Sequence, residues 1–295
     1  MKIALIGANS RIARYISEFI SYDPYSRQNI SYDRESIANK VKGYDVVIIT
    51  IGITKGSADD IWRVNYKIVD EILQGLNSDR IIFLSSIAVY GRRSFSGFDE
   101  SSPTQPNDAY GASKLAAERI VMQSSKRARI LRIGTIFGEY YEQYLDMLRA
   151  WKRHGPFYFG DGKNTVPFIY ARDVAKFISK NLEFNNSDVI NLTSPGIEFM
   201  QVIRDVSEVL GIQMNPRPVR ELFGARLKVP IISTILGYAM EYIYSRKEEI
   251  YPITLSRSFN ITKALSYGLE LTEFKQAIKC FVPYIDHDSS DSVSK

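Results

Sequence analysis

A tyrosine and a lysine four residues apart, Tyr110 and Lys114, stand in the stretch "YGASKLAAERIV". Its small residues and good helix formers predict a helix, on which positions i and i+4 share one face. A phenol with a pKa of about 10 is a poor base at neutral pH, and a neighbouring ammonium favours its ionised form. The pair therefore has the residue types for proton exchange. The alternative is that Lys114 only covers the tyrosine ring with its aliphatic chain.

The N-terminal stretch "KIALIGANSRIAR" joins an apolar run to a helix-like segment through a turn of small residues. Such a turn can bind a pyrophosphate, because backbone N–H groups and the helix dipole attract anions. The usual pattern has three glycines, and here these positions hold Gly7, Ser10 and Ala13. The Ser10 hydroxyl can itself donate to a phosphate, and Ala13 still permits close packing of helix on strand. A plain strand-to-helix turn is the alternative.

The residue that selects between dinucleotides is expected at the end of the second strand, about twenty residues further on. The stretch "NISYDRES" offers Asp33, whose carboxylate would bind the ribose 2′-hydroxyl of NAD, and beside it Arg34, which would pair with the 2′-phosphate of NADP. The segment 23–45 is short, so Asp33 could also end a different strand. The choice between NAD and NADP stays open at this point.

Four apolar, β-rich runs alternate with helix-like stretches. The runs are 2–8, 45–52, 80–86 and 128–134, and the helical stretches are 11–22, 59–76 and 109–126. Continuous apolar strands alternating with helices predict a parallel sheet covered on both faces. We therefore expect an α/β fold with a doubly wound, Rossmann-type sheet, whose ligands bind beyond the carboxyl ends of the strands.

The pattern changes after about residue 138. A helical stretch ends near Gly155, the segment 166–182 resumes a strand followed by a helix, and 196–211 has apolar residues at helical spacing. We expect a dinucleotide-binding domain and a smaller, interleaved substrate lobe. The predicted ranges are 1–138 plus 164–195 for the domain, 139–163 plus 196–288 for the lobe, and 289–295 for a disordered tail.

Composition excludes several classes of function. The net charge of +5 is mild and spread along the chain, which argues against a nucleic-acid partner. One cysteine and two histidines without paired spacing argue against a protein-built metal site. The apolar stretch 229–244 is too short to span a membrane and contains Glu241, so we expect a buried or surface-lying helix there.

The order of these motifs resembles the extended short-chain dehydrogenase/reductase family, which includes NAD(P)-dependent sugar epimerases, dehydratases and ketoreductases. Besides the N-terminal turn, the resemblance rests on Val64-Asn65, on "SSIAVYG" and on Tyr110-x-x-x-Lys114. It implies that Tyr110 carries the proton, that Ser86 hydrogen-bonds the developing oxyanion, and that Lys114 tunes Tyr110 and holds the nicotinamide ribose; Ser85 is then structural. The resemblance implies these cofactor-binding residues: Gly7, Asn9, Ser10, Arg11, Ile12, Asp33, Arg34, Gly52, Asn65, Tyr110 and Lys114.

Departures from the family pattern bear on the substrate. The family's dehydratases carry an acidic pair where this chain has Ile87 and Ala88, so dehydration is not expected. Nucleotide-sugar enzymes of the family usually have Arg where this chain has Val166, and the loss removes a bidentate clamp for a diphosphate. We expect Ser86, Tyr110, Thr135 and Arg220 to contact substrate, with Arg220 among the basic residues that could replace the clamp.

Three functions stay open. The first is hydride transfer at a secondary alcohol or ketone, in a nucleotide-activated sugar, by an oxidoreductase or epimerase using NAD or NADP. The second is the same chemistry on a lipophilic alcohol, because "VPFIYARDVA", the stretch 229–244 and "SFNITKALSYGL" are similar to relatives of 3β-hydroxysteroid dehydrogenases. The third is a dinucleotide-binding protein without turnover. We expect a cytoplasmic homodimer with a small-molecule substrate, and association with a membrane surface stays open.

Overall fold

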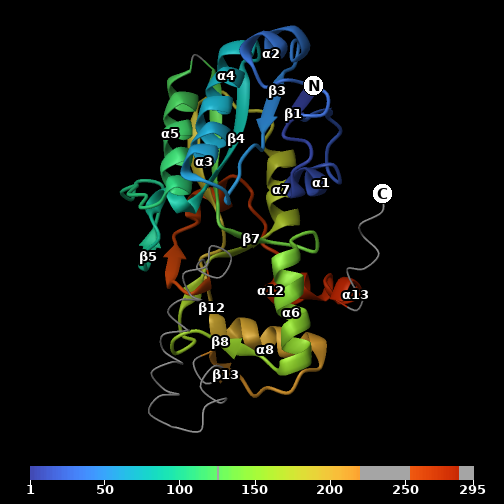
Figure 1. The fold of residues 1–295 in the computed structure, drawn as a ribbon, viewed down its shortest axis with the longest axis vertical. Coiled ribbons are helices and arrows are strands. Elements are labelled where there is room, and N and C mark those ends of the chain that lie inside the picture. Colours follow the sequence, from blue (N-terminus) through green and yellow to red (C-terminus); the bar gives the residue numbers. More distant parts are fainter. Residues whose placement is uncertain (125, 220–252, 286–295) are drawn as a thin grey trace.

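The computed structural model describes residues 1–124, 126–219 and 253–285, and its central element is a six-stranded sheet with only parallel strand pairs. The strand order is β11-β6-β4-β3-β1-β2 (Figure 1). The strands are β1 (Ile3–Ile6), β2 (Asp23–Tyr25), β3 (Val46–Ile49), β4 (Arg80–Ser86), β6 (Arg127–Ile133) and β11 (Asp188–Leu192). The predicted α/β fold with a doubly wound parallel sheet is confirmed.

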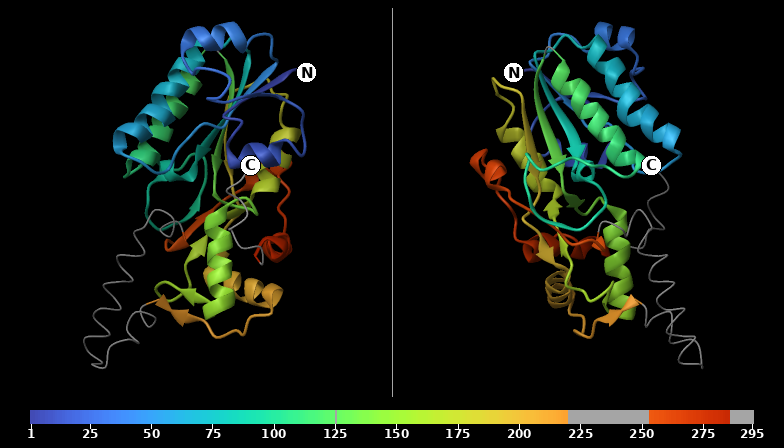
Figure 2. Two further views of the ribbon diagram at one scale, coloured as in Figure 1. Left: turned by 45° about the vertical axis from the view of Figure 1, so that its right-hand side comes forward. Right: turned by 90° about the vertical axis from the view of Figure 1, so that its left-hand side faces the viewer.

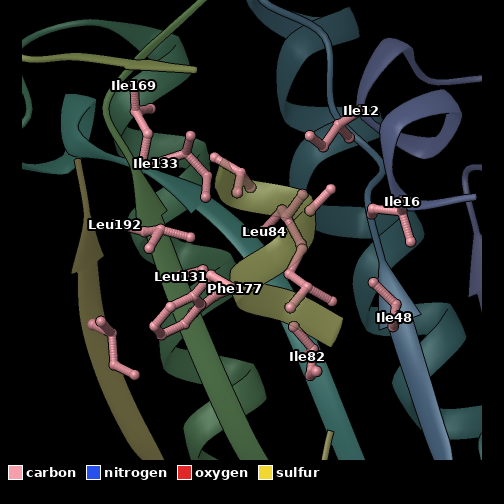
Figure 3. Close-up of a cluster of buried hydrophobic side chains, with 14 of the residues drawn as sticks. Ile12, Ile16, Ile48, Ile82, Leu84, Leu131, Ile133, Ile169, Phe177 and Leu192 are labelled. Atoms are coloured by element: carbon pink, nitrogen blue, oxygen red, sulfur yellow. The ribbon is translucent and has the colours of Figure 1, made fainter. Parts of the chain in front are cut away.

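Helices cover both faces of this sheet (Figure 2). On one face lie α1 (Arg11–Ile16) and α7 (Ala171–Lys180). On the other lie α2 (Arg34–Lys40), α4 (Ile68–Gly75) and α5 (Ala109–Gln123). Figure 3 shows the first of these cores, where Ile12 and Ile16 of α1 and Phe177 of α7 meet the side chains of the strands. Burial on both faces explains why the strands read as continuous apolar runs.

A smaller lobe lies below the carboxyl ends of the strands (Figure 1). Its main helices are α6 (Glu142–His154), α8 (Phe199–Leu210), α12 (Phe274–Lys279) and α13 (Val282–Ile285). They enclose a separate core centred on Trp151 and Phe199, which are fully buried. Two short strand pairs belong to this region, β8 (Phe157–Tyr158) with β13 (Arg217–Pro218) and β9 (Thr165–Val166) with β12 (Ile197–Glu198).

Two further strand pairs connect the sheet with the lobe. Strand β7 (Thr135–Phe137) pairs with β10 (Phe168–Tyr170), and β5 (Phe95–Phe98) pairs with β14 (Arg257–Phe259). After β14, helix α11 (Thr262–Ser266) packs on β11, so residues of the C-terminal region contribute to the sheet core. The proposed division into a dinucleotide-binding domain and a lobe at the residues given above stays a prediction.

The secondary structure matches most of the expected elements. The helix expected over 11–22 is shorter, since α1 ends at Ile16 and the chain turns there. The stretch 59–76 forms α3 (Ala58–Trp62), a π-helix (Arg63–Lys67, labelled η1) and α4. Arg220, the stretch 229–244 and the tail 289–295 lie outside the described residues. Within the described ranges, no helix combines the length and hydropathy that crossing a bilayer requires.

Candidate active site

A cleft of about 220 Å³ opens beyond the carboxyl ends of β1, β2 and β3. The chain leaves β1 toward β2 on one side, and β3 lies on the other, so this is the switch point where open parallel sheets bind ligands. We call it the β1–β3 cleft. Its lining residues are Gly7, Asn9, Ser10, Ser26, Arg27, Tyr32, Thr50, Ile51, Gly52, Ile53, Arg63, Val64 and Ile68.

The turn after β1 is packed against the end of β3. Gly7 has a φ of +98°, and a Cβ at this position would lie 2.6 Å from Thr50 Oγ1. The Ser10 hydroxyl is hydrogen-bonded to the same Thr50 hydroxyl at 2.9 Å. A glycine is therefore required at position 7 both by the backbone conformation and by the approach of Thr50.

The predicted phosphate-binding residues divide into two groups. Gly7, Asn9 and Ser10 line the β1–β3 cleft. Arg11 places its guanidinium 5.6 Å from the centre of the Tyr141 ring, and the side chain of Ile12 is buried in the core under the sheet. The lining of the β1–β3 cleft, as the described residues form it, includes neither Arg11 nor Ile12.

The placement of Asp33 at the end of the second strand is wrong. Strand β2 ends at Tyr25, and Asp33 is the N-cap of α2, where its carboxylate accepts from the Ser36 N–H at 2.8 Å. Hydrogen bonds from Ser31 and then Ser36 hold the pKa of this exposed carboxyl below its usual value. Arg34 opens the same helix, with its backbone N–H donating to Glu71 at 3.3 Å.

The end of β2 instead presents Ser26 and Arg27 to the cleft. The carbonyl of Tyr25 accepts from the N–H groups of Gly7 and Ala8 at 2.8 and 3.1 Å, so β2 ends directly beside the turn after β1. Spacing could have found this residue. Arg27 stands 20 positions after Gly7 (27 − 7), the expected interval for a ribose selector, whereas Asp33 stands 26 after it (33 − 7).

Asn65 fixes the chain after β3. It is fully buried, its side-chain oxygen accepts from the Ile53 N–H at 2.8 Å, and its amide donates to the Ile53 carbonyl at 3.0 Å and to Ser113 at 3.1 Å. It lies in the π-helix, a rare element that occurs frequently at functional sites. Asn65 therefore holds one wall of the β1–β3 cleft against α5.

Ser86 and Tyr110 come together at the end of β4. Ser86 is the last residue of β4 and caps the 3₁₀ turn η2 (Ile87–Tyr90). Burial raises the pKa of the Tyr110 hydroxyl, and hydrogen bonding with Ser86 opposes that rise. Gly111 allows the approach, because a Cβ there would lie 2.4 Å from the Ala88 carbonyl oxygen. The start of α5 can therefore pack directly on the turn that follows Ser86.

Lys114 is buried, with 3% of its surface exposed, and its ammonium faces the ends of two strands. It donates to the carbonyls of Ile51 at 3.0 Å and Leu84 at 2.9 Å. Burial lowers its pKa to about 8, and the charge of Glu118 opposes this shift. The charges that shift the pKa of Tyr110 are those of Asp108 and Arg92. The tuning of Tyr110 by Lys114 thus stays a prediction, whereas the contact of Lys114 with the wall of the β1–β3 cleft is present.

A buried ion pair that the sequence did not indicate lies behind Lys114. Arg132 of β6 donates to the carboxylate of Glu118 from Nη2 at 2.8 Å and from Nε at 3.1 and 3.2 Å. The Ser85 hydroxyl donates to the same carboxylate at 2.5 Å, so Ser85 bonds inward while Ser86 meets Tyr110. Arg132 also donates to the Tyr90 hydroxyl at 2.8 Å. This network fixes α5, which carries Tyr110 and Lys114, to the sheet.

Besides Ser86 and Tyr110, the predicted substrate residues are Thr135 and Arg220, of which Arg220 lies outside the described residues. Thr135 is buried in β7, where its N–H donates to the Pro167 carbonyl at 2.8 Å. Val166 is fully buried in the core of the lobe. Arg217, near the end of the described lobe, donates to the His154 carbonyl at 2.9 Å. The roles of Thr135 and Arg220 in substrate binding stay predictions.

The structure combines a parallel sheet and a glycine turn with a cleft at the switch point of the sheet. A Ser-Tyr-Lys set lies beside that cleft. This combination defines the class of dinucleotide-binding α/β enzymes. The sequence model of the NAD dependent epimerase/dehydratase family matches residues 28–193. The chain belongs to this family. It is therefore an enzyme of the extended short-chain dehydrogenase/reductase type in an NAD dependent family, and this expectation is confirmed.

Individual relatives agree with this membership. The chain is 28% identical over 236 residues to a putative UDP-glucose 4-epimerase of Methanocaldococcus jannaschii, covering 74% of this chain and 67% of the relative. It is 25% identical over 261 residues to the N-acetyl-α-D-glucosaminyl-diphospho-ditrans,octacis-undecaprenol 4-epimerase of Escherichia coli O157:H7, covering 80% and 76%. The structure of a UDP-N-acetylglucosamine 4-epimerase from Bacillus cereus shares the fold with a TM-score of 0.75 and 16% identity, covering 97% of this chain and 100% of that one.

Proposed function

We propose that this protein is a 4-epimerase of a hexose linked to a diphosphate, with Tyr110 as the group that exchanges the proton of the sugar hydroxyl. The observation that carries the proposal is the meeting of Tyr110 with Ser86 at the end of β4, beside Lys114 and the β1–β3 cleft. All three relatives described above are named as 4-epimerases of diphospho-sugars.

The β1–β3 cleft fits a dinucleotide. Its turn leaves no room for a side chain at Gly7, and it offers hydroxyls, amide groups and two guanidinium groups as donors for phosphate oxygens. Gly52 also faces Lys114, since a Cβ there would lie 2.9 Å from Lys114 Nζ. When bound, the dinucleotide supplies the hydride acceptor and donor of the reaction. Gly7, Ser10, Gly52 and Lys114 are the residues that would hold it.

The side chains at the end of β4 would handle the proton. Tyr110 takes the proton from the sugar hydroxyl as its carbon is oxidised and returns it as the carbon is reduced from the other face. Ser86 hydrogen-bonds the same oxygen and supports the charge that develops on it. Lys114 stands one helical turn from Tyr110 on α5, and its positive charge would favour ionised Tyr110. General acid–base groups of this kind contribute about 10²- to 10⁴-fold to rate.

The residues after Ser86 favour epimerisation over dehydration. Elimination of water needs an acid and a base beside the reacting carbons, and Ile87 and Ala88 provide neither. Ile87 is also buried in the core. The alternative of a lipophilic alcohol rested on "VPFIYARDVA", on "SFNITKALSYGL" and on the stretch 229–244, of which the last lies outside the described residues, and this alternative stays open. A binding protein without turnover has no need for Ser86, Tyr110 and Lys114 together.

The test is a substrate panel of UDP-glucose, UDP-N-acetylglucosamine and hydroxysteroids, with C4 epimers followed by NMR and reduced dinucleotide by absorbance. We expect interconversion of epimers without net consumption of dinucleotide. Tyr110→Phe should lower turnover at least a hundredfold and change dinucleotide affinity less than twofold, and the control Tyr22→Phe, beside α1, should keep full activity. Stoichiometric oxidation of dinucleotide, or turnover only of the hydroxysteroids, would overturn the proposal.

A further inference from the structure

The start of α5 carries a negative charge two residues before Tyr110. Asp108 is the N-cap of this helix, and its Oδ1 accepts from the Gly111 N–H at 2.6 Å. A carboxylate is a strong cap, because it satisfies a free N–H group and faces the positive end of the helix. The same charge disfavours a phenolate nearby, since like charges repel. The cap that fixes the start of α5 therefore opposes the ionisation of Tyr110.

A guanidinium neutralises this cap. Nε of Arg92 forms an ion pair with Oδ2 of Asp108, and the two side chains are 24% and 21% exposed. Asp108 thus uses one oxygen for the helix and the other for Arg92. Burial is the main cause that raises the pKa of the Tyr110 hydroxyl. Among the charged groups, Asp108 raises this pKa further and Arg92 lowers it.

The backbone holds Arg92 beside the start of α5. Its N–H donates to the side-chain oxygen of Asn107 at 2.7 Å, and the Asn107 amide donates to the Arg92 carbonyl at 3.4 Å. Gly91, with a φ of +91°, lets the two segments approach, because a Cβ there would collide with the Gln105 carbonyl oxygen. The loop after η2 is therefore fastened to the residues that lead into α5.

The other polar groups around Tyr110 do not neutralise the cap. Ser86, at the end of β4, bonds with the Tyr110 hydroxyl and carries no charge. Burial raises the pKa of Tyr141, which precedes α6, so this neighbour is neutral at pH 7. Lys114, one turn along α5, donates to two strand carbonyls. In the described part of the chain, Arg92 is the cation paired with the cap.

We propose that Arg92 is a positioning residue for the reaction: it neutralises the capping carboxylate of Asp108, so that Tyr110 can give up its proton beside a helix start without net charge. The inference rests on the proposed function in that Tyr110 is the proton carrier. Asparagine is also a strong N-cap, so Asp108→Asn keeps the acceptor for the Gly111 N–H and removes the charge. This substitution separates the charge of the cap from its role in holding the helix.

The first readout is the ionisation of Tyr110, followed by NMR of the full chain isotope-labelled at the tyrosine ζ carbon, with NAD⁺ added. The resonance that is lost in Tyr110→Phe is titrated with pH. Arg92→Gln should raise the pKa of Tyr110 by about 0.5 pH units or more, because the carboxylate is left uncompensated. Asp108→Asn should lower this pKa, and the double variant Arg92→Gln/Asp108→Asn should return to within about 0.3 pH units of the unaltered protein.

The second readout is epimerisation of the UDP-sugar that the substrate panel identifies. In Arg92→Gln the acid limb of kcat should move to higher pH by the same amount, so kcat at pH 7 falls about threefold or more. KM and the affinity for NAD⁺ should change less than about twofold, because a positioning residue acts through Tyr110 alone. The control Arg93→Gln removes a neighbouring exposed charge, bonded to Gln105 at 2.7 Å, and should leave the acid limb in place. Thermal unfolding shows whether each variant is folded.

The outcomes distinguish this inference from the proposed function. An unchanged pKa of Tyr110 in Arg92→Gln, or a double variant as impaired as Arg92→Gln, would refute the role of Arg92 and leave the epimerase proposal intact. A raised KM with an unmoved acid limb would also refute it, because Arg92 would then bind substrate. The expected NMR changes without epimerisation of any sugar would support the role of Arg92 and refute the proposed function. A Tyr110 resonance that shows no ionisation before the protein unfolds would refute both.

Discussion

Replacing Glu118 by Gln tests the network that holds α5 to the sheet. The Glu118–Arg132 pair is almost entirely buried, with 4% and 8% of the two side chains exposed, and the carboxylate also accepts from Ser85. Glutamine keeps the shape but removes the charge, which leaves the Arg132 guanidinium in a buried site with the Tyr90 hydroxyl as its remaining strong partner. Breaking a buried pair in this way costs about 3–5 kcal/mol, so we expect a loss of that size in the free energy of unfolding.

The assay is urea unfolding followed by circular dichroism, with the slope against urea compared between variants to verify that the same surface is exposed. The matched control is Glu35→Gln on the exposed part of α2, which should stay within about 0.5 kcal/mol of the unaltered protein. The double variant Glu118→Leu/Arg132→Met removes both charges and should recover most of the loss. A loss below about 1 kcal/mol in Glu118→Gln would show that Arg132 does not depend on this carboxylate.

Other expected outcomes concern catalysis and cofactor binding. Because burial lowers the pKa of Lys114 to about 8, its ammonium is lost as the pH rises through that value, and kcat/KM should fall above about pH 8. Arginine keeps its charge in this range, so the pH profile of Lys114→Arg should lack this fall even if its kcat/KM is low. A fall that persists in this variant would come from the titration of another group. Asn65→Ala leaves the Ile53 backbone without its partners, so we expect the free energy of unfolding in urea to fall by about 1–3 kcal/mol. Calorimetry should show weaker dinucleotide binding, and unchanged binding would contradict the role of Asn65 in the cleft wall. Gly111→Ala should reduce turnover more than dinucleotide affinity in steady-state and titration assays, because its Cβ would displace the turn after Ser86; equal effects would contradict this.

The sheet could be predicted from the sequence because its strands are buried on both faces. The runs at 2–8, 45–52, 80–86 and 128–134 contain β1, β3, β4 and β6 with small shifts at their ends. The second strand was harder to recognise. Strand β2 has only three residues, two of them exposed, and carries a proline, so it gives no apolar run.

The site was predictable in its residue types but less so in its contacts. A spacing of four on a helix places Tyr110 and Lys114 on one face, yet it cannot show that the Lys114 ammonium bonds two strand carbonyls. The choice of Asp33 followed residue type, whereas the expected spacing of about twenty residues after Gly7 would have pointed to Arg27. The pairing of Glu118 with Arg132 depends on the packing of α5 against β6, which no local pattern reports.

The pairing of β5 with β14 has a consequence for the order in which the protein can fold. The ring of Tyr90 packs against Phe95, Phe98 and Phe259, and the last of these comes from β14. The hydroxyl of the same tyrosine accepts a hydrogen bond from Arg132. During synthesis, more than half of the chain must follow β5 before Arg257–Phe259 can pair with it. Contacts so distant in sequence form late and slowly. The aromatic contacts around Tyr90 are therefore completed only after β14 has been synthesised.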